Sequence, residues 1–252
     1  MTSKKIAFLL PSLWGGGAEK VASKLANKLS KIDNLSVDII CLEGGIKYDL
    51  SEKINYYTLS HLNYTDSIYK KFLFFPFQFS KLLKIIKKRN YRTVINFLNR
   101  PLSLIFVYSL FSLLPFKLII SHRNYMSKEL SDRSTFFNFI LNGFIYRKVI
   151  KSTSKIANNI IVNSESSKLD LIENFNIQKE KIECIYNPFD NSIPSIGVEH
   201  KKLNSKFGSI FDKKIIVTMG SLKNQKGHEH LLRAFSKSKE LYRNSRLLIL
   251  GE

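Results

Sequence analysis

The order of short apolar runs and longer helical segments constrains the fold of this chain more than any other feature. Runs rich in Ile, Val and Leu, such as Ile6–Leu10 and Lys117–Ser121, recur as far as Tyr186 and are separated by segments of helical period. Strands that alternate with helices are typical of βαβ units around a parallel sheet. The sequence therefore predicts an α/β fold with a Rossmann-like parallel sheet domain.

The expected strands follow from the apolar runs and from the turn residues between them. After the first strand, a glycine turn leads into a helix of about sixteen residues from Ala18. Further helices are expected within 67–89, 127–155 and 164–175. The expected strands are Ile6–Leu10, Val37–Leu42, Ile54–Leu59, Thr93–Leu98, Lys117–Ser121, Asn159–Asn163 and Ile182–Tyr186.

Two of the helical segments carry special expectations. Pro76 should kink or divide the helix over Ser67–Arg89, because proline removes a helix hydrogen bond and clashes with the preceding turn. Leu102–Leu114 is the strongest apolar run of the chain. It is shorter than the roughly 20 residues needed to span a bilayer. We therefore expect a buried helix there.

A change of pattern after Asn187 indicates a domain boundary. The segment that follows contains Pro188, Pro194 and Gly197 and has little periodicity, which is typical of a connector. A new β-α-β pattern then begins, with strands Lys214–Met219 and Arg246–Leu250 around a helix from about Gly227 to Leu241.

The predicted organisation is an N-terminal domain over 1–190, a linker over 191–212, and the start of a second Rossmann-like domain over 213–252. One βαβ unit is too small to bury a core of its own. Either the second domain is truncated, or this unit packs on the first domain or on another chain.

The charge of the chain favours anionic partners. Forty Lys and Arg against twenty Asp and Glu give a formal net charge of +20. Nucleic acid, an anionic membrane surface and phosphorylated substrates all fit this excess. No zinc-finger spacing, aromatic RNA-binding pattern or basic tail is present, so we expect no nucleic acid partner.

The cysteines and histidines argue against disulfides and metal sites. Cys41 and Cys184 lie in expected strands without metal-ligand spacing, and the five histidines do not form a metal set. No signal peptide is recognisable at the N-terminus. A reduced cytoplasmic protein fits these observations best.

The first candidate site is the turn Gly15–Gly17 between the first strand and its helix. Glycines let the backbone approach a ligand closely, and the helix N-terminus offers unpaired N–H groups to a phosphate or a sugar. The spacing differs from the GxGxxG pattern of dinucleotide binders. The glycines could equally make a tight turn only, and Glu19 could equally serve the helix dipole.

The second candidate site is the segment from Gly220 to Gly227, which again follows a strand and opens a helix. A lysine in such a turn can place its ammonium group against a diphosphate, and this stabilises the charge that develops on a nucleotide leaving group. Lys223 and Lys226 are the candidates. The alternative is that they are solvated lysines in a surface loop.

Six motifs in order resemble the retaining GT-B glycosyltransferases of family 4. They are the glycine turn with Ala18-Glu19-Lys20-Val21, Asn96–Arg100, Ile119–Asn124, Ile161–Ser164, Lys181–Asp190, and Gly220–Gly227 followed by Ala234-Phe235 and Leu248–Glu252. The resemblance covers the whole chain. It implies that the N-terminal domain is the acceptor side and that the second domain binds the donor nucleotide.

The resemblance implies transfer of a sugar from a UDP- or GDP-sugar to a glycan or polyprenyl-linked acceptor, with retention and without a cofactor or essential metal. His122 or Arg123 would occupy the catalytic position. The donor diphosphate would contact Gly15, Gly16, Gly17, Ser221, Lys223 and Lys226. Asn99, Arg100, Ser164 and Asn187 would lie on the acceptor side.

This chain departs from the family pattern in two ways. Ser221 stands where the family usually carries an arginine that grips the diphosphate, so Lys223 would have to substitute for that charge. The paired glutamates that orient the donor in the family do not occur within these residues. We therefore expect the 252-residue chain alone to transfer sugar poorly.

The segment 70–89 interleaves six Lys and one Arg with Phe, Leu and Ile. Such a segment can lie in a lipid headgroup layer with its aromatics inward and its cations on phosphates. It can also be a core-packed helix with a solvated basic face. The first reading predicts a peripheral protein on the inner face of the cytoplasmic membrane. The family resemblance implies a role in bacterial surface polysaccharide or glycoprotein assembly.

Two other functional classes stay open at this stage. The chain could be a non-catalytic module that binds a glycan or lipid, or a half-enzyme that needs a separate donor domain. It could also be a basic nucleic-acid-binding α/β protein, although only the net charge favours this alternative.

Overall fold

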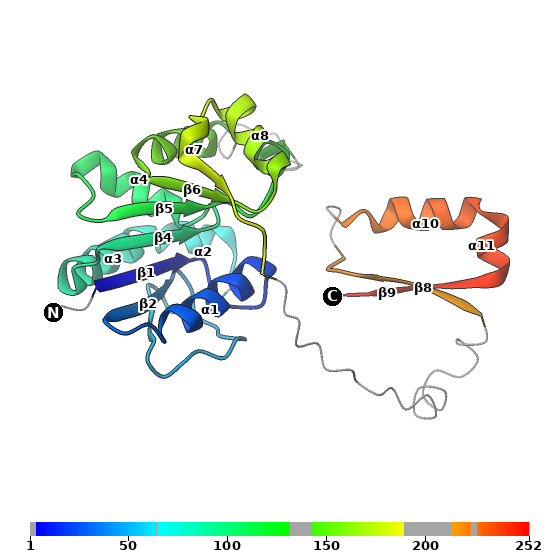
Figure 1. Cartoon of the computed structure of the whole chain (residues 1–252), viewed down its shortest axis with the longest axis horizontal. Helices are drawn as coiled ribbons and strands as arrows, with labels where there is room; N and C mark the ends of the chain where they lie inside the picture. The colour runs from blue at the N-terminus through cyan, green and yellow to red at the C-terminus, as the bar shows by residue number, and fades with distance from the viewer. Residues whose placement is uncertain (1–3, 64, 132–142, 189–212, 223–225, 252) are drawn as a thin grey trace. The chain divides into compact units, whose positions relative to one another are not determined.

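The computed structural model describes residues 4–63, 65–131, 143–188, 213–222 and 226–251. The chain divides into two compact units, Met1–Phe189 and Asp190–Glu252, here called unit 1 and unit 2. Each described part is a parallel sheet with helices (Figure 1). The expected linker, 191–212, lies outside the described residues.

Within the described residues, unit 1 is built on a seven-stranded parallel sheet with the order β3-β2-β1-β4-β5-β6-β7. The chain adds β2 and β3 on one side of β1 and the later strands on the other side. The strand order therefore reverses between β1 and β4. The strands are β1 Lys4–Leu10, β2 Leu35–Cys41, β3 Asn55–Thr58, β4 Thr93–Phe97, β5 Lys117–Ser121, β6 Asn159–Val162 and β7 Ile182–Cys184.

Local signals in the sequence set several helix ends in unit 1. The Ser164 side chain accepts a hydrogen bond from the backbone N–H of Ser167 at the start of one helix. Asn90 and Asn176 end two others in the left-handed conformation, which asparagine tolerates better than most residues. The helices are α1 Gly17–Leu29, α2 Ile68–Leu73, α3 Phe75–Arg89, α4 Leu102–Phe111, α5 Met126–Ser131, α7 Ile145–Ile156 and α8 Glu165–Phe175, with a short 3₁₀ turn at Lys179–Lys181.

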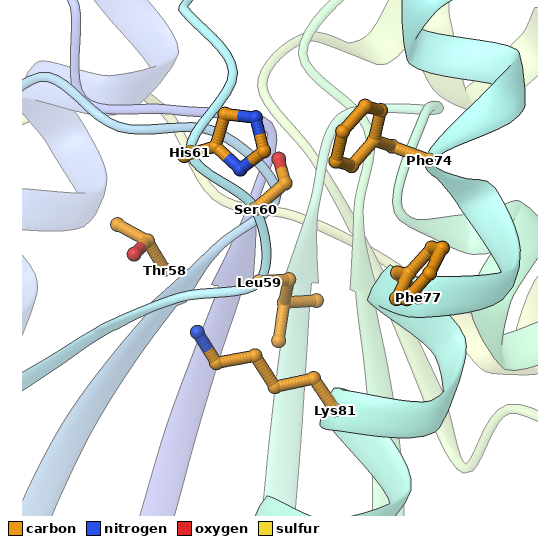
Figure 2. A pocket seen from close by; sticks show the side chains of 7 residues that line it. All are labelled: Thr58, Leu59, Ser60, His61, Phe74, Phe77 and Lys81. Atoms are coloured by element: carbon orange, nitrogen blue, oxygen red, sulfur yellow. The ribbon is translucent and has the colours of Figure 1, made fainter.

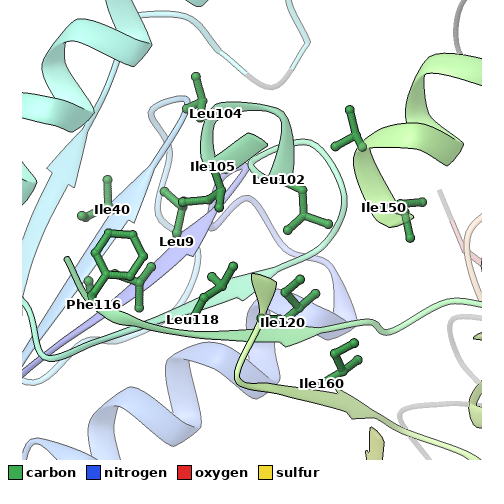
Figure 3. Packing of buried hydrophobic residues seen from close by; sticks show 14 of the residues in the cluster. Leu9, Ile40, Leu102, Leu104, Ile105, Phe116, Leu118, Ile120, Ile150 and Ile160 are labelled. Carbon is green, nitrogen blue, oxygen red and sulfur yellow. The ribbon is translucent and has the colours of Figure 1, made fainter. Parts of the chain in front are cut away.

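The core of unit 1 lies on both faces of the sheet, as expected for parallel strands. Alternate residues of β1 point to opposite faces: Ala7 and Leu9 pack with α3, α4, α7 and α8, whereas Phe8 and Leu10 pack with α1. Figure 3 shows the first of these clusters, in which side chains from β1, α4 and β5 meet. The Rossmann-like α/β prediction is confirmed.

The basic helical segment is divided as the proline predicted, but the break lies at Phe74. Helix α2 ends at Leu73 and α3 begins at Phe75, so Pro76 occupies the first turn of α3. Proline is tolerated there because the first N–H groups of a helix have no intrahelical acceptor. Asp38 at the middle of β2 then holds the other end of α3 through Arg89.

The expectation of a wholly buried helix at 102–114 is wrong. Helix α4 buries Leu102, Leu104 and Ile105 at its start, but Phe111 is 79% exposed and Leu113 is 95% exposed. An apolar run shows only that its residues are hydrophobic. Which of their side chains are buried depends on the elements that pack against the helix. No helix in the described part of the chain is long and apolar enough to span a bilayer.

Unit 2 contains the parallel pair β8 Lys214–Met219 and β9 Ser245–Leu250. The single helix expected over 227–241 is instead two helices, α10 His228–Lys237 and α11 Lys239–Asn244, because Ser238 between them is extended. Both helices lie on one face of the strand pair (Figure 1). None of the hydrophobic side chains described in unit 2 is buried.

Candidate active site at the carboxyl edge of the unit 1 sheet

The carboxyl ends of parallel strands meet at one edge of the sheet, and buried polar residues gather there in unit 1, including the predicted residues Asn99 and His122. Ser12 follows β1, Glu43 follows β2, Asn99 follows β4, and His122 follows β5. All four are buried. Ligands of open α/β sheets bind at this edge, where the strand order reverses. In unit 1 that point lies between β1 and β4.

Polar atoms at this edge are buried without hydrogen-bond partners in the described part of the chain. Buried polar groups in native proteins are nearly always paired, so a group of exceptions at one edge indicates a place for a polar ligand or for water. The atoms are Ser12 Oγ, Glu43 Oε2, Asn96 Oδ1, Asn99 Oδ1, Ser121 Oγ, both ring nitrogens of His122 and Arg123 Nε.

His122 is a deeply buried titratable group of this set, with 1% of its surface exposed. Its backbone N–H donates to the carbonyl of Ile161 on the neighbouring strand, at 2.9 Å. Burial lowers the pKa of the imidazole to about 4, although the charge of Asp170 acts in the opposite direction. His122 is therefore neutral at pH 7, and its ring can donate one hydrogen bond and accept another.

Arg123 contacts two side chains of its own at this edge, Phe97 and Asn187. Its guanidinium lies over the Phe97 ring, 5.2 Å from the centroid, and Nη1 donates to Asn187 Oδ1 at 2.9 Å. Burial lowers the pKa of Arg123. The structure thus brings together Arg123 and Asn187, which sequence analysis assigned to different roles.

Glu43 is a functional candidate that sequence analysis missed. Its side chain is fully buried, and Oε1 accepts a hydrogen bond from Arg100 Nη2 at 2.5 Å. Lys71 Nζ lies 3.4 Å from the same oxygen. A carboxylate directly after an apolar strand was the available signal, but its two cationic partners come from distant parts of the chain.

The glycine turn is already occupied by a side chain of its own helix. A methyl group on Gly16 would overlap with the carboxylate of Glu19, which is buried at the start of α1. Gly15 has a φ of 134°, a conformation that glycine adopts readily. Tyr48 Oη donates to the Gly16 carbonyl at 2.8 Å. Because Glu19 brings negative charge to this helix N-terminus, a phosphate can approach only where Glu19 leaves room.

Ser164 has a structural role in this fold. Its hydroxyl caps α8 and also contacts the hydroxyl groups of Ser166 and Ser167. Gly17 is exposed, and a side chain there would meet no other atom within 4 Å. Neither observation assigns a ligand to these two predicted residues.

The candidate donor loop lies in unit 2 between β8 and α10. Ser221 offers its carbonyl to the His228 ring at 3.1 Å, and Lys226 is exposed beside Gly220. Lys223 lies outside the described residues. The end of β9 closes tightly on this loop, because a side chain on Gly251 would overlap with the carbonyl oxygen of Gly220.

Within the described ranges, no group of three or more His, Cys, Asp or Glu side chains could hold a metal ion.

The fold is that of GT-B glycosyltransferases. Sucrose-phosphate synthase from Thermosynechococcus elongatus superposes with a TM-score of 0.74 at 14% identity, over 98% of this chain and 62% of that one. HepE from Anabaena, solved with UDP-glucose, gives 0.64 at 17% identity over 97% and 60%. These likenesses concern the fold.

The chain belongs to Glycosyltransferase Family 4, which residues 15–192 match. A relative from Campylobacter jejuni is 29% identical over 251 residues, or 99% of this chain. That protein is N-acetylgalactosamine-N,N'-diacetylbacillosaminyl-diphospho-undecaprenol 4-alpha-N-acetylgalactosaminyltransferase. The chain spans 63% of the length of this relative. The family resemblance seen in the sequence is confirmed.

Proposed function

We propose that this chain takes part in transferring a sugar, with retention, from a UDP- or GDP-sugar to a glycan or lipid-linked glycan. The observation that carries the proposal is the set of buried polar atoms without partners at the carboxyl edge of unit 1. A sugar ring presents hydroxyl groups that donate and accept, and these can pair with an amide, a carboxylate and a neutral imidazole.

In this proposal Asn99, Arg100 and His122 face the acceptor or the transferred sugar, with Arg123 and Asn187 at the rim. A neutral His122 suits a neutral sugar hydroxyl, because it pays no cost for holding a buried charge. Family membership supports the assignment of unit 1 to the acceptor.

In unit 2, the loop between β8 and α10 is proposed to bind the donor diphosphate. In unit 1, the proposed phosphate-binding segment is the glycine turn Gly15–Gly17. Lys226, together with Ser221 and Lys223, would stabilise the negative charge that develops as the sugar leaves. This stabilisation needs no essential metal. Hydrogen-bond donors and a cation suffice when they are already in position.

The acceptor is proposed to be a glycan on a polyprenyl diphosphate, because the relative from Campylobacter jejuni acts on such a lipid. A feature of unit 1 agrees with this. Helices α2 and α3 carry a basic aromatic face, here called the α2–α3 surface, and positions 67–89 contain no acidic residue. Its large exposed side chains, all more than 70% exposed, are Tyr69, Phe72, Leu73 and Phe77.

Aromatic and cationic side chains on one face suit the headgroup layer of an anionic membrane. The protein is therefore proposed to work peripherally on the cytoplasmic face of the membrane, where lipid-linked acceptors and nucleotide sugars meet.

The test is a binding and turnover experiment with the purified chain. UDP- and GDP-sugars and a short-chain lipid-linked glycan are titrated, and sugar transfer is followed by mass spectrometry. We expect acceptor binding that His122→Ala weakens and that an exposed change, Lys31→Ala, leaves unchanged. Glycan binding that is indifferent to His122→Ala would contradict the proposed site.

A second candidate is a half-enzyme or glycan-binding module that needs a separately encoded donor domain. The observation that favours it is the open unit 2, in which Met219 is 80% exposed and Leu222 is 64% exposed. Such apolar surface calls for further polypeptide to cover it. Firm acceptor binding without nucleotide-sugar binding would favour this candidate, whereas robust turnover by the chain alone would exclude it.

A further inference from the structure

A cavity of about 420 Å³ opens beside the α2–α3 junction of unit 1. Its lining comes from two segments, the end of β3 with the loop after it and the start of α3. Figure 2 shows the Phe74 and Phe77 rings on the helix side, Leu59 between the two segments, and Lys81 extending below Leu59. The lining residues are Thr58, Leu59, Ser60, His61, Phe74, Phe77 and Lys81. This volume is in the range of small-molecule sites, roughly 300–1,000 Å³.

Hydrogen bonds hold the two sides of the cavity together. Ser60 Oγ donates to the Leu42 carbonyl at 2.7 Å. Gln78 of α3 is buried and donates to the same carbonyl and to Ser60 Oγ, each at 3.1 Å. The His61 ring meets Phe74 edge-on, with centroids 4.7 Å apart. The cavity is therefore preformed, and a ligand would not have to order it.

The chemistry of the lining fits an apolar chain with an anionic end. Leu59, Phe74 and Phe77 offer hydrocarbon surface, while Lys81 adds the cation. The whole α2–α3 surface lacks acidic residues, so an anion beside the cavity meets no opposing carboxylate from these helices. A neutral apolar ligand would use the aromatic walls and leave the cation unused.

The cavity lies at the same edge of the sheet as the candidate active site. It opens after β3, which is three strands from β4 and four from β5 in the sheet. At about 4.8 Å per strand, the ends of β3 and β4 are separated by about 15 Å. Leu42, which anchors the cavity, is followed by Glu43, and Glu43 joins Lys71 of α2 to Arg100 after β4.

Two cationic side chains, Lys71 of α2 and Arg100 after β4, thus meet at the Glu43 carboxylate, and Arg100 stays one third exposed there. A molecule with a hydrocarbon chain, a diphosphate and a sugar, in that order, would match the apolar cavity, the cationic side chains and the candidate active site. We propose that the cavity binds the isoprenoid units next to the diphosphate of a prenyl-linked acceptor, so that the sugar end reaches Arg100 and His122. This inference rests on the proposed function and adds a binding site for the lipid itself.

The probe is farnesyl diphosphate, used without vesicles, together with a diazirine-bearing analogue for photolabelling of the full chain. Two pairs of matched variants separate the cavity from the surface around it. Phe77→Ser and Lys81→Ala change lining residues, whereas Phe72→Ser and Lys84→Ala change exposed residues of the same helices outside the lining. Circular dichroism checks that all four variants fold.

We expect photolabels within 58–61 and 74–81, and a dissociation constant that rises about tenfold in Phe77→Ser and stays unchanged in Phe72→Ser. Lys81→Ala should weaken farnesyl diphosphate more than farnesol. Equal weakening by Phe72→Ser and Phe77→Ser would overturn the cavity, since it would show general surface binding. Dodecyl phosphate that binds as tightly as farnesyl diphosphate would overturn the choice of an isoprenoid, and absence of binding would overturn the site.

The proposed function is tested separately by nucleotide-sugar binding and transfer. Prenyl diphosphate binding that persists in a chain without any sugar transfer or glycan binding would retain the cavity and reject the proposed function. Sugar transfer that is indifferent to Phe77→Ser and Lys81→Ala, with prenyl acceptors, would retain the function and reject the cavity.

Discussion

Glu43 Oε1 and Arg100 Nη2 lie 2.5 Å apart, so a fully buried carboxylate after β2 holds the guanidinium that follows β4. Arg100 is one third exposed, and Lys71 of α2 contacts the same carboxylate oxygen. A buried carboxylate with two cations has a fixed position, and so have its partners. The relationship makes Arg100 a pre-positioned side chain at the candidate active site.

Glu43→Gln should destabilise unit 1 by about 1–3 kcal/mol, because Arg100 and Lys71 lose a charged acceptor at a buried position. The partial exposure of Arg100 keeps the loss below that of a fully buried pair. Urea unfolding measures the change, with the exposed Glu52→Gln as control. Identical unfolding midpoints for the two variants would show that the contact contributes nothing.

Asp38→Asn should be more costly, at about 2–4 kcal/mol. Asp38 is fully buried and accepts hydrogen bonds from Arg89, from Tyr91 Oη at 2.7 Å and from Asn55. Its charge and hydrogen bond raise the pKa of Arg89. The exposed Asp33→Asn is the matched control in thermal unfolding. Tyr91→Phe should cost less, about 1 kcal/mol, since it removes one neutral donor.

The glycine turn offers a pair of neighbouring substitutions with opposite expectations. Gly16→Ala should cost about 1 kcal/mol, because its methyl group displaces the Glu19 carboxylate from the start of α1. Gly17→Ala should be neutral or stabilising by up to about 1 kcal/mol, since alanine is the better helix former. Melting temperatures distinguish the two. If Glu19→Ala fails to relieve the cost of Gly16→Ala, the carboxylate is not its cause.

Stability should fall as the pH drops from about 6.5 to about 4. The pKa of His122 is lowered from 6.5 to about 4 by burial, so the unfolded chain binds the proton first within this window. The imidazole contributes stability that is complete above the unfolded pKa and is lost as pH falls through the folded pKa. The loss is at most about 3 kcal/mol. His122→Gln should flatten the profile of unfolding free energy against pH, and an unchanged slope would argue against a buried neutral imidazole.

The α2–α3 surface should bind anionic vesicles in a salt-dependent manner. At low salt we expect co-sedimentation with phosphatidylglycerol vesicles, weaker after Lys84→Glu and unchanged after Lys31→Glu, which lies beyond α1. High salt should release the protein, because the Debye length shrinks from about 10 Å at 0.1 M to about 3 Å at 1 M. Failure to pellet at low salt would end the membrane proposal.

Most of the fold could be predicted because parallel strands buried on both faces leave near-continuous apolar runs. Lys117–Ser121 has the predicted bounds for this reason. Lys214–Met219 also has the predicted bounds, although its side chains are exposed or only partly buried. The exposed end of α4 could not be predicted, since the apolar run is uniform and what covers it is decided by elements distant in sequence. The break at Ser238 separates two helices that share one apolar period, so the pattern alone did not reveal it.

Some residues of the candidate site could likewise be predicted from the sequence, and others could not. His122 and Asn99 could be named because each follows a predicted strand within a motif of the family. Glu43 could not, because its meaning depends on Arg100, which is 57 residues away in the chain. The charge state of His122 depends on burial, which its neighbours in sequence do not encode.

The close approach of Gly251 to Gly220 bears on which substitutions the loop of unit 2 can accept. The ends of β8 and β9 meet through main-chain atoms, and the Gly220 N–H donates to the Leu250 carbonyl at 2.8 Å. Main-chain atoms thus hold the start of this loop, without the side chain of Ser221. Replacement of an arginine by Ser221 could alter the chemistry offered to a leaving group while the path of the polypeptide stayed the same, provided that both glycines were retained.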